Sequence, residues 1–162
     1  MTEERDTLSG GCQCGAVRYR LAAPPTEPSI CHCRMCQKAF GSYIAALANV
    51  PVADLAWTRG RPAVFHSSEA VERGFCRDCG TPLTYRVTDQ DRMSISIGSL
   101  DDPDRVVPEI AFGLQGKREA FARLDGLPGR NTEESEDPAL LARMASRQHP
   151  DHDTDSWPPP GR

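Results

Sequence analysis

The chain has 162 residues and a formal net charge of −4, a length that indicates one domain. No apolar run approaches the roughly 18 residues of a membrane span, and the polar N-terminus does not resemble a signal peptide. Basic side chains are scattered among acidic ones, so no nucleic-acid-binding face is indicated. We therefore expect a cytoplasmic protein that binds neither membrane nor nucleic acid; its oligomeric state is left open.

Short β-like segments dominate the first 112 residues. Residues 16–21 alternate apolar and polar side chains, as a half-buried strand does, and the Pro-rich residues 22–28 form a connection. A short helix is expected over residues 34–40. Further strands are expected over residues 42–50, 63–66, 82–87, 92–97 and 106–112. The pattern predicts a mostly β fold with short helices.

The C-terminal part differs in charge and structure. Residues 131–162 hold seven acidic and three basic side chains, so this tail carries the whole net charge of −4. Asp137 and Pro138 suit the first positions of a helix, which we expect over about residues 137–148. We divide the chain into a disordered N-terminus at 1–7, a cysteine-bearing domain at 8–130 and this acidic tail, with its last ten residues lacking fixed structure.

The seven cysteines form three groups, which are Cys12-x-Cys14, Cys31-x-Cys33-x-x-Cys36 and Cys76-x-x-Cys79. In a reducing compartment, clustered thiols bind metal more often than they form disulfides, and seven thiols cannot all pair. Thiolates suit zinc, which takes four of them in a closed structural site and three in an open one.

The spacing divides the seven thiols into four and three. The central group supplies three ligands by itself, whereas each outer pair needs a second pair. We therefore assign Cys12, Cys14, Cys76 and Cys79 to a structural zinc ion, and Cys31, Cys33 and Cys36 to a second zinc ion with a vacant position. The alternatives are one cluster of all seven thiols, three free thiols, or a redox pair at Cys76 and Cys79.

Three segments carry a family resemblance: GGCQCGAVRY at 10–19, CHCRMCQKAFGS at 31–42 and SSEAVERGFCRDCGTPLTY at 67–85. Together they resemble the glutathione-dependent formaldehyde-activating enzyme family, which includes centromere protein V, over roughly residues 8–128. The resemblance implies an Mss4-like, zinc-stapled β architecture, to which the predicted C-terminal helix is an appendage. It also implies the same division of the cysteines into a structural and a catalytic zinc site.

The resemblance implies a carbon–sulfur lyase that joins glutathione and formaldehyde, or another thiol and small aldehyde, in the synthetic direction. A thiol bound to zinc loses its proton, so the substrate sulfur would enter the open position as a thiolate. Arg34 and Lys38 are candidate cations to offset its charge; the alternative is that both are ordinary surface charges.

Two other functions stay open. One is a zinc-based carrier of glutathione-like thiols without turnover. The other is a zinc-stabilised interaction module, in which His32 or His66 closes the second site. The chain also departs from the family pattern, with Glu109 where many members have His and Ala120-Phe121 where a Trp often stands. Both positions bear on which substrate is used.

Overall fold

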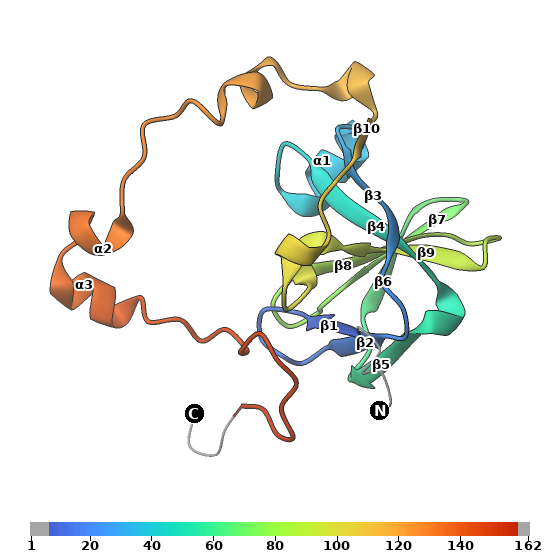
Figure 1. Ribbon diagram of the computed structural model, residues 1–162, viewed down its shortest axis with the longest axis horizontal. Helices are drawn as coiled ribbons and strands as arrows, with labels where there is room; N and C mark the ends of the chain where they lie inside the picture. Colours follow the sequence, from blue (N-terminus) through green and yellow to red (C-terminus); the bar gives the residue numbers. More distant parts are fainter. Residues whose placement is uncertain (1–6, 159–162) are drawn as a thin grey trace, which may run out of the picture.

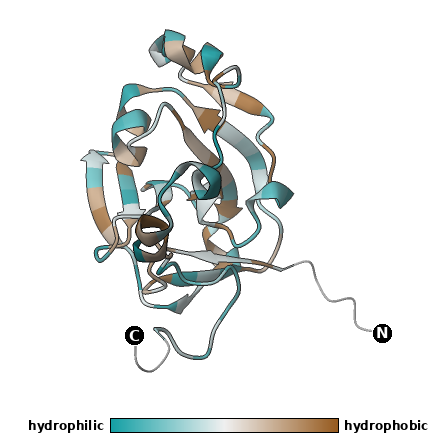
Figure 2. Ribbon diagram, turned by 90° about the vertical axis from the view of Figure 1, so that its left-hand side faces the viewer, coloured by the Kyte–Doolittle hydropathy of each residue, from teal (hydrophilic) through white to brown (hydrophobic). Residues whose placement is uncertain are grey.

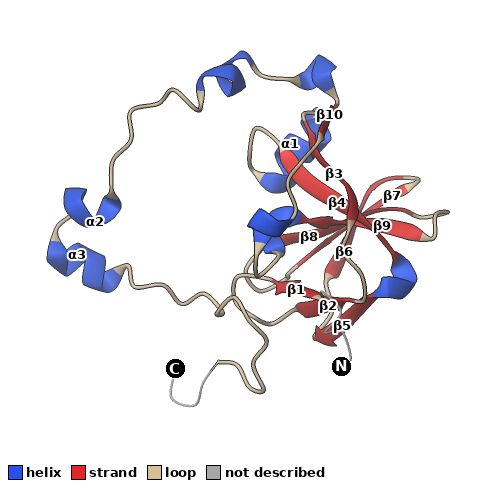
Figure 3. Ribbon diagram, in the orientation of Figure 1, coloured by secondary structure: helices blue, strands red, loops and turns tan. Residues whose placement is uncertain are grey.

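The protein is mostly β, as the sequence predicts (Figures 1 and 3). The computed structural model describes residues 7–158. The smaller sheet has the order β1-β2-β5 and is antiparallel. Its strands are β1 (Leu8–Gly11), β2 (Arg18–Leu21) and β5 (Leu55–Arg59).

The larger sheet has the order β10-β3-β4-β9-β8-β7-β6, and only the β10–β3 pair is parallel. Its strands are β3 (Thr26–Cys31), β4 (Ala45–Pro51), β6 (Ala63–Ser68), β7 (Val71–Phe75), β8 (Pro82–Val87), β9 (Arg92–Ser96) and β10 (Ile110–Phe112). Teal and brown residues alternate along several strands, as expected where one face is buried (Figure 2).

The described helices are all short. The α-helices are α1 (Arg34–Phe40), α2 (Thr132–Ser135) and α3 (Pro138–Arg143). Short 3₁₀ helices cover Val52–Asp54, Ile97–Ser99, Pro103–Arg105, Leu114–Gly116 and Glu119–Arg123. Within residues 7–158, no helix is long and apolar enough to cross a membrane.

Several elements differ from those expected. The sequence pattern does not predict β1, β3, β5 or β7. Strands β3 and β5 pair with segments far away in the sequence, β10 and β2, whereas β1 and β7 pair with their neighbours in the chain. The strand expected over 106–112 is confined to β10, because Pro108 has no N–H to donate to a neighbouring strand. Helix α3 ends at Arg143, five residues before the expected limit. Of the N-terminal segment expected to be disordered, residues 1–6 lie outside the described part.

One hydrophobic core contains residues of both sheets. Its fully buried side chains include Tyr19 and Leu21 of the smaller sheet and Leu83 and Ile95 of the larger one. The Tyr19 hydroxyl lies 2.9 Å from Ser99 Oγ, so its polar end is satisfied inside the core. Cys12 and Cys76 belong to the same cluster of buried residues, so the first and third cysteine groups lie at the edge of the core.

The C-terminal segment returns to the body instead of ending without structure. After the turn at 119–123 the chain runs out in an arc that carries α2 and α3, then comes back beside β1 and β2 (Figure 1). There His149 N–H donates to the Gln13 carbonyl at 2.8 Å, and Trp157 Nε1 donates to the Cys14 carbonyl at 2.6 Å. The expectation of disorder is therefore wrong for residues 153–158; residues 159–162 lie outside the described part.

A buried ion pair fixes this returning segment. Arg18 is 3% exposed and donates two hydrogen bonds of 2.6 Å to the Asp101 carboxylate. It also donates to Asp153 Oδ1 at 2.8 Å, and Arg20 donates to Asp153 Oδ2 at 2.6 Å. Arg18 thus connects strand β2 with Asp101, which lies two residues after the Ile97–Ser99 turn, and with the C-terminal segment.

We predict that Asp101→Asn destabilises the protein by about 3–5 kcal/mol, because it leaves much of the charge of buried Arg18 uncompensated. Arg20→Gln should cost less than about 1 kcal/mol, since Arg20 is 55% exposed in its ion pair. Urea unfolding followed by circular dichroism measures both values. Equal losses in the two variants would contradict this account of Arg18.

The acid dependence of stability provides a second test of the same contact. Partial burial acts to raise the pKa of Asp153, but hydrogen bonds from Arg18 and Arg20 outweigh it and lower the pKa. A lowered pKa in the folded state stabilises the protein at pH values above the ordinary pKa of a carboxyl group. This stabilisation is lost as the pH falls through the folded pKa. We expect a smaller loss of stability below pH about 4 in Asp153→Asn than in the wild type. Identical acid unfolding profiles would contradict this.

Candidate metal centres

Four thiols from two hairpin turns converge at the first centre. Cys12 and Cys14 lie in the β1–β2 turn, and Cys76 and Cys79 lie in the β7–β8 turn. Their four Sγ atoms all lie within 4.8 Å of one another. Cys12 Sγ is 3.6 Å from Cys14 Sγ, which is 3.7 Å from Cys76 Sγ. All seven cysteines of the chain are free thiols, so none of these contacts is a disulfide.

This spacing fits a tetrahedral ion. Four sulfurs bound to zinc at about 2.3 Å stand about 3.8 Å apart, close to the two observed separations. Backbone bonds shape both turns, since Cys12 N–H donates to Val17 O and Cys76 N–H donates to Thr81 O, each at 2.9 Å. Gly80 has φ +79°, a conformation that glycine adopts without strain. The sequence-predicted group of four is therefore brought together and could hold a metal ion.

The C-terminal segment covers the β1–β2 turn of this centre. Gly15 leaves room for it, because a Cβ there would lie 2.4 Å from the His149 ring and 2.6 Å from the Trp157 ring. The two rings pack edge to face with centroids 5.0 Å apart, and His149 is 3% exposed. Residues at the far end of the chain thus shield the turn that holds Cys14.

Three thiols meet at the second centre. Cys31 ends strand β3, Cys33 is the N-cap of α1, and Cys36 lies in the first turn of that helix. Their ligand atoms lie within 4.8 Å of one another. Cys33 Sγ accepts from the Cys36 N–H at 3.4 Å, so one side chain caps the helix and joins the cluster. Among the described residues, no fourth Cys, His, Asp or Glu belongs to this group.

Neither candidate histidine closes the second centre. His32 is 1% exposed and its ring packs edge to face against Phe121, with centroids 4.8 Å apart. His66 is exposed and its Nδ1 lies 3.8 Å from Glu72. This arrangement argues against four protein ligands at the second centre.

Arg73, on strand β7, is the cation at the second centre. It is 7% exposed, and its Nη2 donates to Cys36 Sγ at 3.5 Å. Its Nε donates to Ser67, and its guanidinium lies 5.0 Å from the centre of the Tyr85 ring. Its Nη1 has no hydrogen-bond partner among the described residues. A fixed positive charge therefore stands beside the sulfur cluster.

The cations expected from sequence lie elsewhere. Arg34 donates to Gln37 Oε1, and both Arg34 and Lys38 line a pocket beside α1. Among the described residues, neither of them forms a hydrogen bond with a thiol. Sequence reasoning missed Arg73 because it lies 37 positions after Cys36, in a strand with no motif that marks it.

Each centre combines thiols that resist ionisation with one that ionises readily. Burial raises the pKa of Cys14, Cys31 and Cys76, and that of Cys36 to about 12. Burial also acts on Cys79, but hydrogen bonds from the Thr81 hydroxyl and backbone outweigh it and lower the pKa to about 6. The pKa of Cys33 is lowered likewise, by a hydrogen bond from the Cys36 backbone that outweighs burial. Thiols gathered in this way are the donor set of a thiophilic cation.

We predict that Trp157→Ala speeds the loss of metal from the first centre at least several-fold, because it uncovers the turn that carries Cys14. Trp157→Phe keeps a ring against Gly15 but lacks the Nε1 donor, so it should give an intermediate rate. The measurement is the release of zinc to a chromogenic chelator. Equal rates in all three proteins would show that the C-terminal segment does not protect the centre.

Comparison with known proteins identifies the family of this chain. The model of the family "Glutathione-dependent formaldehyde-activating enzyme" matches residues 7–115, about two thirds of the chain and all seven cysteines. A Halomonas elongata protein whose name provisionally assigns it to this enzyme group is 31% identical over 84 residues. That match covers 47% of this chain and 54% of the relative, so the chain spans about half the length of the curated relative it matches.

A crystal structure of a Rhodobacter sphaeroides protein aligns with 64% of this chain and 98% of its own, at 24% identity and a TM-score of 0.49. The family match is what decides the assignment, because it covers both hairpin turns and the segment from Cys31 to Cys36. The chain belongs to the glutathione-dependent formaldehyde-activating enzyme family.

Proposed function

We propose that this protein is a zinc-dependent carbon–sulfur lyase that forms and breaks the adduct of a thiol, such as glutathione, with a small aldehyde, such as formaldehyde. The observation that carries the proposal is the second centre, where three thiols meet and, among the described residues, no fourth protein ligand joins them. A ligand set of this kind leaves one position for a substrate. Family membership supports the same reaction class.

Cys31, Cys33 and Cys36 would hold the second zinc ion, and Cys12, Cys14, Cys76 and Cys79 the structural one. Bound zinc would lower the pKa of a substrate thiol so that it reacts as a thiolate. The thiol sulfur then forms a bond to the carbonyl carbon. The π electrons of the carbonyl move to its oxygen, which takes up one proton; the lyase direction reverses these changes.

Arg73 has an electrostatic role in this proposal. Three thiolates and Zn²⁺ carry a net charge of about −1, and a substrate thiolate makes it about −2. A second negative charge in a partly buried site is costly unless a cation lies close. Arg73, which donates to Cys36 Sγ, supplies that cation.

The other assignments follow the same reasoning. Cysteine-bearing turns from the two sheets meet at the first centre, and this supports an Mss4-like, zinc-stapled class of fold. The unpaired state of seven thiols suits a reducing compartment, which supports a cytoplasmic location.

We predict that the wild-type protein accelerates formation of S-(hydroxymethyl)glutathione and that Cys33→Ser abolishes the acceleration. Serine keeps the N-cap of α1, because its hydroxyl can accept from the Cys36 N–H, so the variant should fold and retain the ion of the first centre. The reaction is followed by NMR exchange between free and bound formaldehyde, with metal content measured alongside. If the wild type binds glutathione without accelerating the reaction, the protein is a thiol carrier instead. Equal acceleration by the wild type and the variant would show that the reaction does not take place at the second centre.

We also predict that Arg73→Gln weakens zinc binding at the second centre by about 10- to 100-fold, as loss of a residue that contacts a metal ligand commonly does. The first centre should be unaffected, and Arg73→Lys should recover part of the loss because it keeps the charge. Competition with a chelator of known affinity separates the two ions. Unchanged affinity at the second centre in Arg73→Gln would contradict the role given to this residue.

A further inference from the structure

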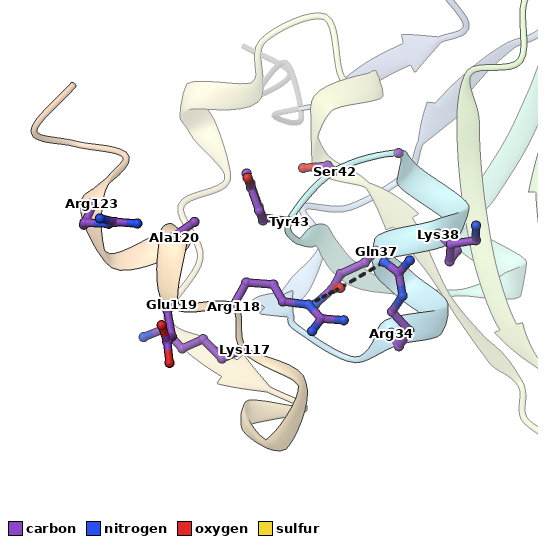
Figure 4. Close-up of a pocket in the computed structure, with 11 residues that line it drawn as sticks. Arg34, Gln37, Lys38, Ser42, Tyr43, Lys117, Arg118, Glu119, Ala120 and Arg123 are labelled. Carbon is purple, nitrogen blue, oxygen red and sulfur yellow. Dashed lines mark hydrogen bonds between the residues drawn. The ribbon is translucent and has the colours of Figure 1, made fainter. Parts of the chain in front are cut away.

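A pocket of about 1280 Å³ opens beside α1, apart from the two groups of cysteines. It is formed by α1, the residues just after that helix, and residues 117–123 (Figure 4). Five of its lining side chains are cations, and Glu119 is its one acid among the described residues. The cations are Arg34, Lys38, Lys117, Arg118 and Arg123. The lining therefore has a formal excess of four positive charges.

A buried amide holds two of these cations together. Gln37 is 3% exposed, and its Nε2 is fixed by donation to the carbonyls of His32 at 2.6 Å and Gly116 at 2.8 Å. Its Oε1 faces the pocket and accepts from Arg34 Nη1 at 3.3 Å and from Arg118 Nε at 3.2 Å (Figure 4). Two guanidinium groups from distant segments thus share one oxygen atom.

In the part of the chain that the structure describes, these cations lack ion-pair partners. Like charges held close together repel each other, and an anion bound between them offsets this repulsion. Arginine donates paired N–H groups in the geometry that matches phosphate and carboxylate oxygens. The pocket is thus complementary to a group with several negative charges.

The pocket is close enough to the second centre for one ligand to reach both. The Gln37 N–H donates to the Cys33 carbonyl at 3.0 Å, so the amide that holds the two arginines lies one helical turn after a proposed zinc ligand. Gly41 ends the helix, about 12 Å along the axis from Cys33 at 1.5 Å per residue. Residues 113–116 pack against the same point, because a Cβ at Gly113 would lie 2.7 Å from Cys33 N.

We propose that this pocket binds the non-reacting end of the thiol substrate, and that this end carries several negative charges as phosphate or as clustered carboxylates. The inference rests on the proposed function and specifies its substrate class. Glutathione has two carboxylates and one ammonium, a net charge of about −1 at pH 7, which offsets only part of the excess of four. The pocket thus fits a thiol that is more anionic than glutathione. Ala120, one of the two departures from the family pattern, lines this pocket.

The test measures anion binding to the zinc-loaded protein directly, by calorimetric titration with inorganic pyrophosphate and, separately, with citrate. We expect one of the two to bind, and Arg118→Gln and Arg34→Gln each to weaken its binding about tenfold or more. The matched control is Arg143→Gln, which removes the same charge from the exposed helix α3, outside the pocket. It should leave the affinity unchanged. Tighter binding of pyrophosphate identifies a phosphate-bearing thiol, and tighter binding of citrate a polycarboxylate.

Two results would overturn the proposal: neither anion binds the wild type, or Arg143→Gln weakens binding as much as Arg118→Gln does. A kinetic arm separates this proposal from the proposed function. If the protein catalyses adduct formation, the anion that binds should compete with the thiol and raise its apparent KM. Catalysis without such competition would refute the pocket's role and leave the reaction standing. Anion binding without any catalysis would support the pocket and refute the lyase.

Discussion

The structure depends on the meeting of two hairpin turns that belong to different sheets. The β1–β2 turn brings Cys12 and Cys14, and the β7–β8 turn brings Cys76 and Cys79, into one cluster. Leu, Ile, Val and Phe make up only roughly 18% of the chain, so the hydrophobic core is thin. A structural zinc ion contributes on the order of 10–16 kcal/mol in small zinc peptides, against a net stability of about 5–15 kcal/mol for a typical domain. An ion in this cluster would therefore hold both sheets in register with each other.

The two groups of cysteines differ in what surrounds them, and this difference separates their proposed roles. The first is embedded at the edge of the core and covered by the returning C-terminal segment. The second lies at the N-terminus of α1, with three thiols, a buried arginine and a cationic pocket along the helix. A closed, shielded cluster suits a structural ion, whereas an incomplete one beside cations suits an anionic substrate.

Local patterns were enough to predict the cysteine groups and most of the larger sheet. The pairing of Cys12 and Cys14 with Cys76 and Cys79 followed from ligand number, since each pair needed another. Arg73 and the pocket could not be predicted in this way, because the contact of Arg73 with Cys36 depends on the strand order of the larger sheet. The same holds for Trp157, whose partner lies 143 residues away. Arg34 and Lys38 lie next to the ligands in the sequence, but both side chains line the pocket beside α1.

The central claim is that one cluster is closed by four sulfurs and the other is left open by three. X-ray absorption spectroscopy of the zinc-loaded protein, with and without a bound thiol, tests it most directly. The account predicts two zinc ions per chain and an average of 3.5 sulfur ligands per ion, which rises to 4 when a thiol binds. One ion per chain, or a sulfur count that stays the same on thiol addition, would contradict it.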